Sequence, residues 1–117
     1  MWSVDVSRVE TWVAQLDESS RAQVFAAIEI LQEHGPQLGR PLVDTIVGSR
    51  HSNLKELRPG SAGRSEVRML FAFDPTRRAI FLVAGDKAGN WKRWYKQNIP
   101  IADRLLDQHL QAMKEGG

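Results

Sequence analysis

The most constraining feature of this sequence is a short segment that is apolar at every position. Residues 79–84 read Ala-Ile-Phe-Leu-Val-Ala. A run of this length that is apolar on both faces, and rich in branched and aromatic side chains, is typical of a central β-strand. The segments on either side must therefore supply its neighbours in a sheet.

The residues before this strand predict further strands. Residues 2–6 alternate in polarity, and residues 54–58 form a short strand followed by the turn-forming residues 59–63. In residues 65–73 a period of two separates two faces. The core face carries Val67, Met69, Phe71 and Phe73, and the opposite face carries Glu66, Arg68, Leu70 and Ala72.

Helical periodicity occurs at both ends of the chain. Apolar residues at helical spacing predict one helix after Ser7, with Val9, Trp12, Val13 and Leu16 on one face, and a second helix from Ser20 with a capping box. Gly35 and Pro36 end the second helix. Residues 37–53 predict a long connector without regular structure, and a last helix starts near Pro100.

This order of elements predicts a single α+β domain spanning residues 1–117. We expect a twisted antiparallel sheet, with an N-terminal αα-hairpin packed on one face and a C-terminal helix. The sequence has no cysteine, so disulfides and thiolate metal sites are excluded. Neither a signal peptide nor a run of about 20 apolar residues is present, so we expect a cytoplasmic protein with no membrane partner.

Charge is distributed unevenly along the chain. Residues 50–96 contain eleven Lys or Arg and four Asp or Glu, a net charge of +7, whereas residues 1–49 carry −4 and residues 97–117 carry −1. A basic middle between acidic ends favours a surface built for an anionic partner, of which nucleic acid is the commonest. The alternative is a solvated basic face without a partner.

Four side chains of the basic region are expected to converge on the sheet face opposite the core. Arg68 projects from that face in mid-strand and is expected to be exposed. Arg58, Lys87 and Tyr95 lie on or just beyond neighbouring strands. Arginine supplies planar, bidentate donors to phosphate oxygens, so this set indicates a phosphodiester ligand. The alternative is that these side chains are exposed to solvent on the sheet and bind no ligand.

Other chemistries lack support in the sequence. His34, His51 and His109 are scattered and have no second ligand at metal-binding spacing. The basic region has no acidic pair for Mg²⁺, and the glycines at residues 60–63 are not followed by the Lys and Ser/Thr of a P-loop. We therefore expect no metal and no cofactor.

Five ordered motifs are similar to those of the phage-derived, HigB-type branch of the RelE/ParE toxin superfamily. They are residues 39–44 (GRPLVD), 49–58 (SRHSNLKELR), 68–75 (RMLFAFDP), 84–87 (AGDK), and 95 with 99–103 (IPIAD). The resemblance covers nearly the whole chain. It implies a RelE-like fold and the toxin of a type II toxin–antitoxin system, held inactive by a cognate helix-turn-helix antitoxin.

The resemblance also implies an activity and its residues. RelE-like members enter the ribosomal A site and cut mRNA without a metal, because the RNA 2′-OH attacks the adjacent phosphate. Carried over, Arg68 contacts the scissile phosphate and Arg58 is the basic residue of the preceding strand. Lys87 is the basic residue after the last core strand, and Tyr95 stacks on a base or transfers a proton. Glu56 departs from the pattern, as an exposed charge near where the best-known members carry lysine.

The general base is left open between two residues. Neighbouring cations disfavour the protonated form of Lys87 and favour the phenolate of Tyr95. Around this centre, seven further residues are expected to bind RNA: Lys55, Arg64, Trp91, Lys92, Arg93, Trp94 and Lys96. Either tryptophan could stack on an unpaired base, worth roughly 1–3 kcal/mol, or could simply dock the last segment onto the sheet.

Two functions of other classes remain open alternatives. A ParE-like toxin shares the fold but poisons DNA gyrase by binding it, without nuclease activity. A catalytically dead RNA-binding protein is the other alternative. The combination of Arg58, Arg68, Lys87 and Tyr95 favours the endoribonuclease.

Overall fold

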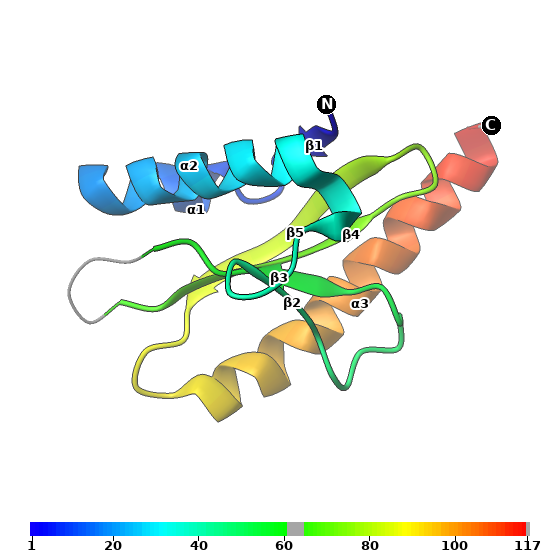
Figure 1. The fold of residues 1–117 in the computed structure, drawn as a ribbon. Coiled ribbons are helices and arrows are strands. Elements are labelled where there is room, and N and C mark those ends of the chain that lie inside the picture. The colour runs from blue at the N-terminus through cyan, green and yellow to red at the C-terminus, as the bar shows by residue number, and fades with distance from the viewer. Residues whose placement is uncertain (61–64, 117) are drawn as a thin grey trace.

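A five-stranded sheet organises the molecule, in the order β1-β5-β4-β3-β2 (Figure 1). The structure is a computed structural model, and it describes residues 1–60 and 65–116. The strands are β1 (Ser3–Asp5), β2 (Val43–Thr45), β3 (Lys55–Leu57), β4 (Val67–Phe73) and β5 (Arg78–Asp86). The expected central strand is confirmed, since β5 lies between β1 and β4.

Helices cover both faces of this sheet (Figure 1). The helical elements are α1 (Glu10–Ala14), α2 (Glu18–His34), the 3₁₀ turn η1 (Gly35–Gln37) and α3 (Trp91–Gly116). The α1–α2 hairpin lies on one face and α3 crosses the other. The α+β class, the N-terminal hairpin and the C-terminal helix are confirmed.

Strand β4 contributes to two hydrophobic cores. Met69 and Phe71 are fully buried against the hairpin, as the period of two predicts. Leu70 and Ala72 point the other way and are fully buried against Ala102 and Leu106 of α3 and their neighbours. The face opposite the hairpin is therefore a second core, and only part of it remains for a site.

The sheet differs from the prediction in two respects. It is mixed, because β1 pairs in parallel with β5, while the other pairs are antiparallel. The expected connector also contains a strand, β2, whose Val43 is 2% exposed and pairs with Leu57. Three residues with a single buried side chain are too few to give a periodic signal.

The helix starts also differ from the prediction. Asp17, and not Ser20, caps α2, because its carboxylate accepts the backbone N–H of Ser20. Helix α1 has no side-chain cap, and the Ser7 that precedes it bonds Asp5. The predicted stop at Gly35 is confirmed, with φ at 61° and its N–H bonded to the Leu31 carbonyl.

Helix α3 begins at Trp91, nine positions before the predicted start. Pro100 lies inside the helix, where it removes one backbone donor and is normally costly. The expectation that Pro100 starts the helix was therefore wrong. As a result Trp91, Trp94 and Tyr95 stand at helical spacing on the first turns of α3 and not in a loop.

None of the helices in residues 1–60 and 65–116 is both long and apolar enough to cross a membrane.

Candidate functional site

Glu56 stands at the centre of the site, on the sheet face that α3 covers. It is 2% exposed and pairs with Leu70 of β4. Its Oε1 accepts Nε of Arg58 at 2.7 Å, and its Oε2 accepts the hydroxyl of Tyr95 at 2.6 Å. The expectation of an exposed charge here was wrong, because α3 lies over this strand and brings Tyr95 onto the carboxylate.

Arg68 is also more buried than expected. Its side chain is 14% exposed, with Nη1 donating to its neighbour's carbonyl, Val67 O, at 2.8 Å. Its Nε lies 4.0 Å from Oε1 of Glu56, and among the residues that the structure describes this buried atom has no hydrogen-bond partner. A buried donor without an acceptor is costly, so the Arg68 guanidinium keeps a donor that its surroundings do not satisfy.

Arg58 extends the cluster toward β2. Its Nη2 lies 3.4 Å from Oδ2 of Asp44, which also accepts Nη2 of Arg40 at 2.8 Å. The Arg58 side chain is about one third exposed. It can therefore reach a ligand from solvent while Glu56 fixes its Nε.

Tyr95 is a neutral phenol in this arrangement. Burial and the hydrogen bond and negative charge of Glu56 raise its pKa well above the ordinary value, although the nearby Arg68 lowers it in part. The expectation that cations favour a phenolate fails here, because Glu56 lies closer to the hydroxyl. Tyr95 is thus a proton donor that fastens α3 to β3.

Lys87 lies over the Tyr95 ring. It follows Asp86, the last residue of β5, and its Nζ is 6.0 Å from the ring centroid. The same Nζ lies 3.8 Å from Oε1 of the half-exposed Glu66. Arg58, Arg68, Lys87 and Tyr95 thus gather on one face of the sheet, with Glu56 among them.

The other RNA-binding candidates are placed unevenly. Lys55 pairs with Phe71 and so lies on the opposite sheet face. Arg64 is outside the described residues. Lys92, Arg93 and Lys96 are exposed on the first turns of α3, and Nζ of Lys92 lies 5.5 Å from the Trp91 ring.

The two tryptophans of this segment differ in their surroundings. Trp94 packs on Gly85, where a Cβ atom would lie 2.4 Å from the indole Nε1, and its ring meets Tyr95 edge-on at 5.2 Å. Trp91 is 54% exposed. Trp94 therefore docks α3 onto the sheet, whereas about half of Trp91 remains exposed to solvent.

An open pocket adjoins the charged cluster. Its lining combines apolar and polar side chains, which is typical of ligand sites. The lining residues are Asp44, Thr45, Ile46, Val47, Glu56, Arg58, Trp91, Tyr95 and Ile99. Glu56 and residues 44–47 were not predicted as part of the site, since their place depends on β2 and on the early start of α3.

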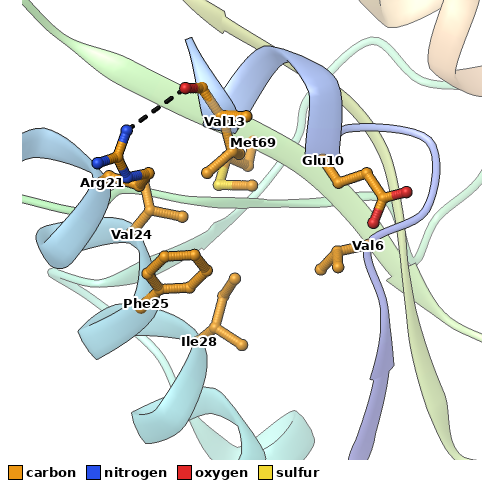
Figure 2. Close-up of a pocket in the computed structure, with 9 residues that line it drawn as sticks. Val6, Glu10, Val13, Arg21, Val24, Phe25, Ile28 and Met69 are labelled. Atoms are coloured by element: carbon orange, nitrogen blue, oxygen red, sulfur yellow. Dashed lines mark hydrogen bonds between the residues drawn. The ribbon is translucent and has the colours of Figure 1, made fainter. Parts of the chain in front are cut away.

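A second pocket lies on the hairpin side of the molecule, between α1, α2 and β4 (Figure 2). Apolar side chains dominate its lining, among them Val13, Phe25 and Met69. Arg21 stands at its edge and donates to the Leu16 carbonyl at 3.0 Å. It holds none of the predicted site residues.

The histidines serve structural contacts. His109 is buried, and its Nε2 lies 2.9 Å from Oδ2 of Asp74, while Nε2 of His51 lies 2.7 Å from Oδ1 of Asp107. His34 closes α2. In the part of the chain that the structure describes, no three His, Cys, Asp or Glu side chains are grouped so that they could hold a metal ion.

Comparison of the sequence with known proteins identifies its family. Residues 11–107, which include Glu56, Arg58, Arg68, Lys87 and Tyr95, match the model described as phage-derived protein Gp49-like (DUF891). The chain is 57% identical over 114 residues to HigB2, a candidate toxin of Mycobacterium tuberculosis (strain ATCC 25618 / H37Rv). It is 53% identical over 110 residues to the candidate toxin HigB3 of the same organism.

The coverage of these relatives differs. The alignment with HigB2 covers 97% of this chain but 57% of that protein, so the chain spans little more than half of its length. The alignment with HigB3 covers 94% of both.

Proposed function

This chain belongs to the Gp49-like family of phage-derived proteins and to its HigB-type toxins, and we propose that it is an endoribonuclease acting as the toxin of a type II toxin–antitoxin system. The substrate is mRNA, read in the A site of the translating ribosome. The observation that carries the proposal is the pair Arg58 and Arg68 around Glu56, with Nε of Arg68 buried and lacking a hydrogen-bond partner within residues 1–60 and 65–116.

The proposed reaction is an internal transesterification. The ribose 2′-oxygen forms a bond to the adjacent phosphorus and the bond from phosphorus to the 5′-oxygen breaks, which leaves a 2′,3′-cyclic phosphate and a free 5′-hydroxyl. The base takes the proton of the 2′-OH, and a solvent water molecule supplies the proton that the departing 5′-oxygen gains. Arg58 and Arg68 stabilise the added charge of the pentavalent intermediate.

The geometry supports different roles for Lys87, Tyr95 and Glu56. Lys87 is the proposed general base. Tyr95 is not, because its hydroxyl stays protonated and donates a hydrogen bond to Glu56. Both oxygens of Glu56 are engaged, one by Arg58 and one by Tyr95. Glu56 is therefore proposed to position these two residues and not to accept the proton of the 2′-OH.

Two partners follow from the proposal, and the first is RNA. The exposed cations at the start of α3, Lys92, Arg93 and Lys96, are proposed to contact RNA phosphates near the cleavage centre. The second partner is a cognate helix-turn-helix antitoxin that holds the toxin inactive. Co-expression with the adjacent reading frame, followed by co-purification, tests that pairing.

Primer extension on a defined mRNA tests the activity, with purified protein and with or without translating ribosomes. The comparison uses the wild type, Arg68→Ala, Arg68→Lys and, as matched control, Arg104→Ala, which removes an exposed arginine of α3. We expect cuts that depend on ribosomes. Arg68→Ala should lose about 100-fold or more in cleavage rate, Arg68→Lys less, and Arg104→Ala nothing.

Three outcomes would contradict the proposal in different ways. Cleavage by folded Arg68→Ala at the wild-type rate would overturn the site. Cuts on free RNA would keep the ribonuclease and remove the ribosome. Absence of cleavage in both conditions, together with inhibition of gyrase supercoiling, would favour a ParE-like mode of action.

A further inference from the structure

Two exposed apolar side chains face the same pocket from distant parts of the sequence. Val47, in the connection between β2 and β3, is 91% exposed, and Trp91, the first residue of α3, is 54% exposed. Both line the pocket beside Arg58 and Tyr95. Large apolar side chains held in solvent at a polar pocket are candidates for ligand contact.

The backbone around Val47 is fastened, so its exposure is built into the fold. Ile46 donates its N–H to the Leu54 carbonyl at 2.9 Å. Beyond the loop tip, Ser49 Oγ bonds Oδ1 of the buried Asp103 at 2.5 Å, and the Arg50 N–H bonds Oδ2 of the same residue at 3.1 Å. These bonds tie the loop to α3, the helix that also carries Trp91.

The charges around this apolar pair favour a ligand that is flat, apolar and attached to an anion. Arg58 lies in the pocket, and the two carboxylates that also line it, Asp44 and Glu56, are both engaged by Arg58. Lys92 stands 5.5 Å from the Trp91 ring. A nucleotide combines a π-face with a phosphate, and aromatic side chains bind unpaired bases by stacking.

We propose that Val47 and Trp91 form a subsite for one unpaired nucleobase of RNA, whose phosphate lies toward Arg58. This inference rests on the proposed function and extends it, because it assigns base contact to a defined pocket next to the cleavage centre. It also gives the two tryptophans of α3 different roles, because Trp94 packs on Gly85 and docks the helix, whereas Trp91 is proposed to contact the base. Because purines offer a larger stacking surface than pyrimidines, the subsite should prefer purines.

The test uses a 2′-O-methyl hexanucleotide, which cannot be cut because it lacks the nucleophile. Four tryptophans give four indole N–H signals in a ¹⁵N spectrum, and Trp91→Phe identifies that of Trp91. We expect this signal to move most on titration, further with a purine oligomer than with a pyrimidine one, and little with an oligomer of abasic units.

Affinity measurements on variants complete the experiment. We expect Trp91→Ala to bind the purine oligomer about tenfold more weakly, Trp91→Phe to recover most of the loss, and Val47→Ser to lose less. Phe25→Ala is the matched control, because Phe25 is 53% exposed but lies at the hairpin pocket (Figure 2). Its affinity should equal that of the wild type.

The results separate this inference from the proposed function. Equal binding of base-bearing and abasic oligomers would overturn the subsite, as would wild-type affinity in Trp91→Ala, even if the protein cleaves mRNA. A base preference that disappears with Trp91→Ala, in a protein that cuts no mRNA, would retain the subsite and overturn the ribonuclease.

Discussion

On one face of the sheet α1 and α2 pack through apolar side chains, whereas on the other face α3 is held by buried charges as well. Among the described residues, the buried charged and histidine side chains are Glu56, Asp74, Asp103 and His109. Each takes part in a hydrogen bond between α3 and the rest of the molecule. Hydrogen bonds are directional and fix orientation, while apolar contacts tolerate small shifts. The candidate site lies on the α3 side of the sheet, where these hydrogen bonds fix the orientation of the helix.

The largest effect on stability should come from the apolar side of this comparison. Phe71 is fully buried and stacks on Phe81 at 5.0 Å. We expect Phe71→Ala to lower the free energy of unfolding by about 3–5 kcal/mol. Phe25→Ala, in the same helical layer but exposed, should cost under about 1 kcal/mol. Urea unfolding measures both, and similar losses would show that the hairpin core is not the main source of stability.

On the α3 side, Glu56→Ala should have a smaller effect on stability and a large one on activity. Removing the carboxylate leaves Tyr95 and Arg58 without their partner. We expect a loss of about 2 kcal/mol, because the Arg58 side chain is 34% exposed and solvent can compensate it in part. Chemical unfolding, alongside the cleavage assay, measures the two effects. Full activity in a folded Glu56→Ala variant would remove the proposed positioning role.

Asp74, which bonds His109 of α3, makes the free energy of unfolding depend on pH. Burial raises the pKa of its carboxyl, but hydrogen bonds from Thr76, His109 and the backbone of Arg78 outweigh burial and hold the pKa below the ordinary 3.8. The stabilisation by the ionised form is therefore complete above about pH 5 and is lost as pH falls through the lower, folded-state pKa. We expect Asp74→Asn to lose about 1–2 kcal/mol at pH 7 and to show a flatter fall in unfolding free energy below pH 4. A slope equal to that of the wild type would contradict this.

The smallest expected change in stability belongs to Tyr95, but it has the clearest signal. Tyr95 is the single tyrosine of the chain, so tyrosinate absorbance near 295 nm reports on it alone. Its raised pKa means that the folded protein should show little tyrosinate at pH 10, where the unfolded chain is half ionised. The linked stabilisation is complete below pH 10 and declines above it.

Two variants sharpen this titration. Tyr95→Phe should cost about 1 kcal/mol, and Glu56→Gln should bring the Tyr95 pKa down by removing the negative charge. An unchanged titration in folded Glu56→Gln would show that burial alone protects the phenol.

Periodicity predicted the fold well where an element buries one clear face. The alternation at Met69 and Phe71 and the stop at Gly35 needed only local rules. The strand at Val43 was missed because it is specified by its pairing with Leu57 and not by its own composition. The start of α3 was missed because Pro100 normally ends or begins a helix, and here tertiary packing overrides its local cost.

The candidate site shows the same limit. Its cations could be named from residue type and strand order, and the structure does bring Arg58, Arg68, Lys87 and Tyr95 to one face. Glu56 was misjudged because a carboxylate is expected at the surface unless it is paired. Its partners come from other elements, Arg68 on β4 and Tyr95 on α3, and only the folded chain brings them together.

The contact between Gly85 and Trp94 has a consequence for how this protein can diverge. The indole occupies the volume that any side chain at position 85 would need, since a Cβ there would lie 2.4 Å from Nε1. Gly85 also pairs with Arg68 across the strands, so an indole pushed outward would disturb the cleavage centre. Substitution at either position should therefore be rare alone and should occur as a coupled exchange, in which position 94 becomes smaller before position 85 becomes larger. The two positions should therefore covary, and the order of their substitutions should follow from the volume that the indole occupies.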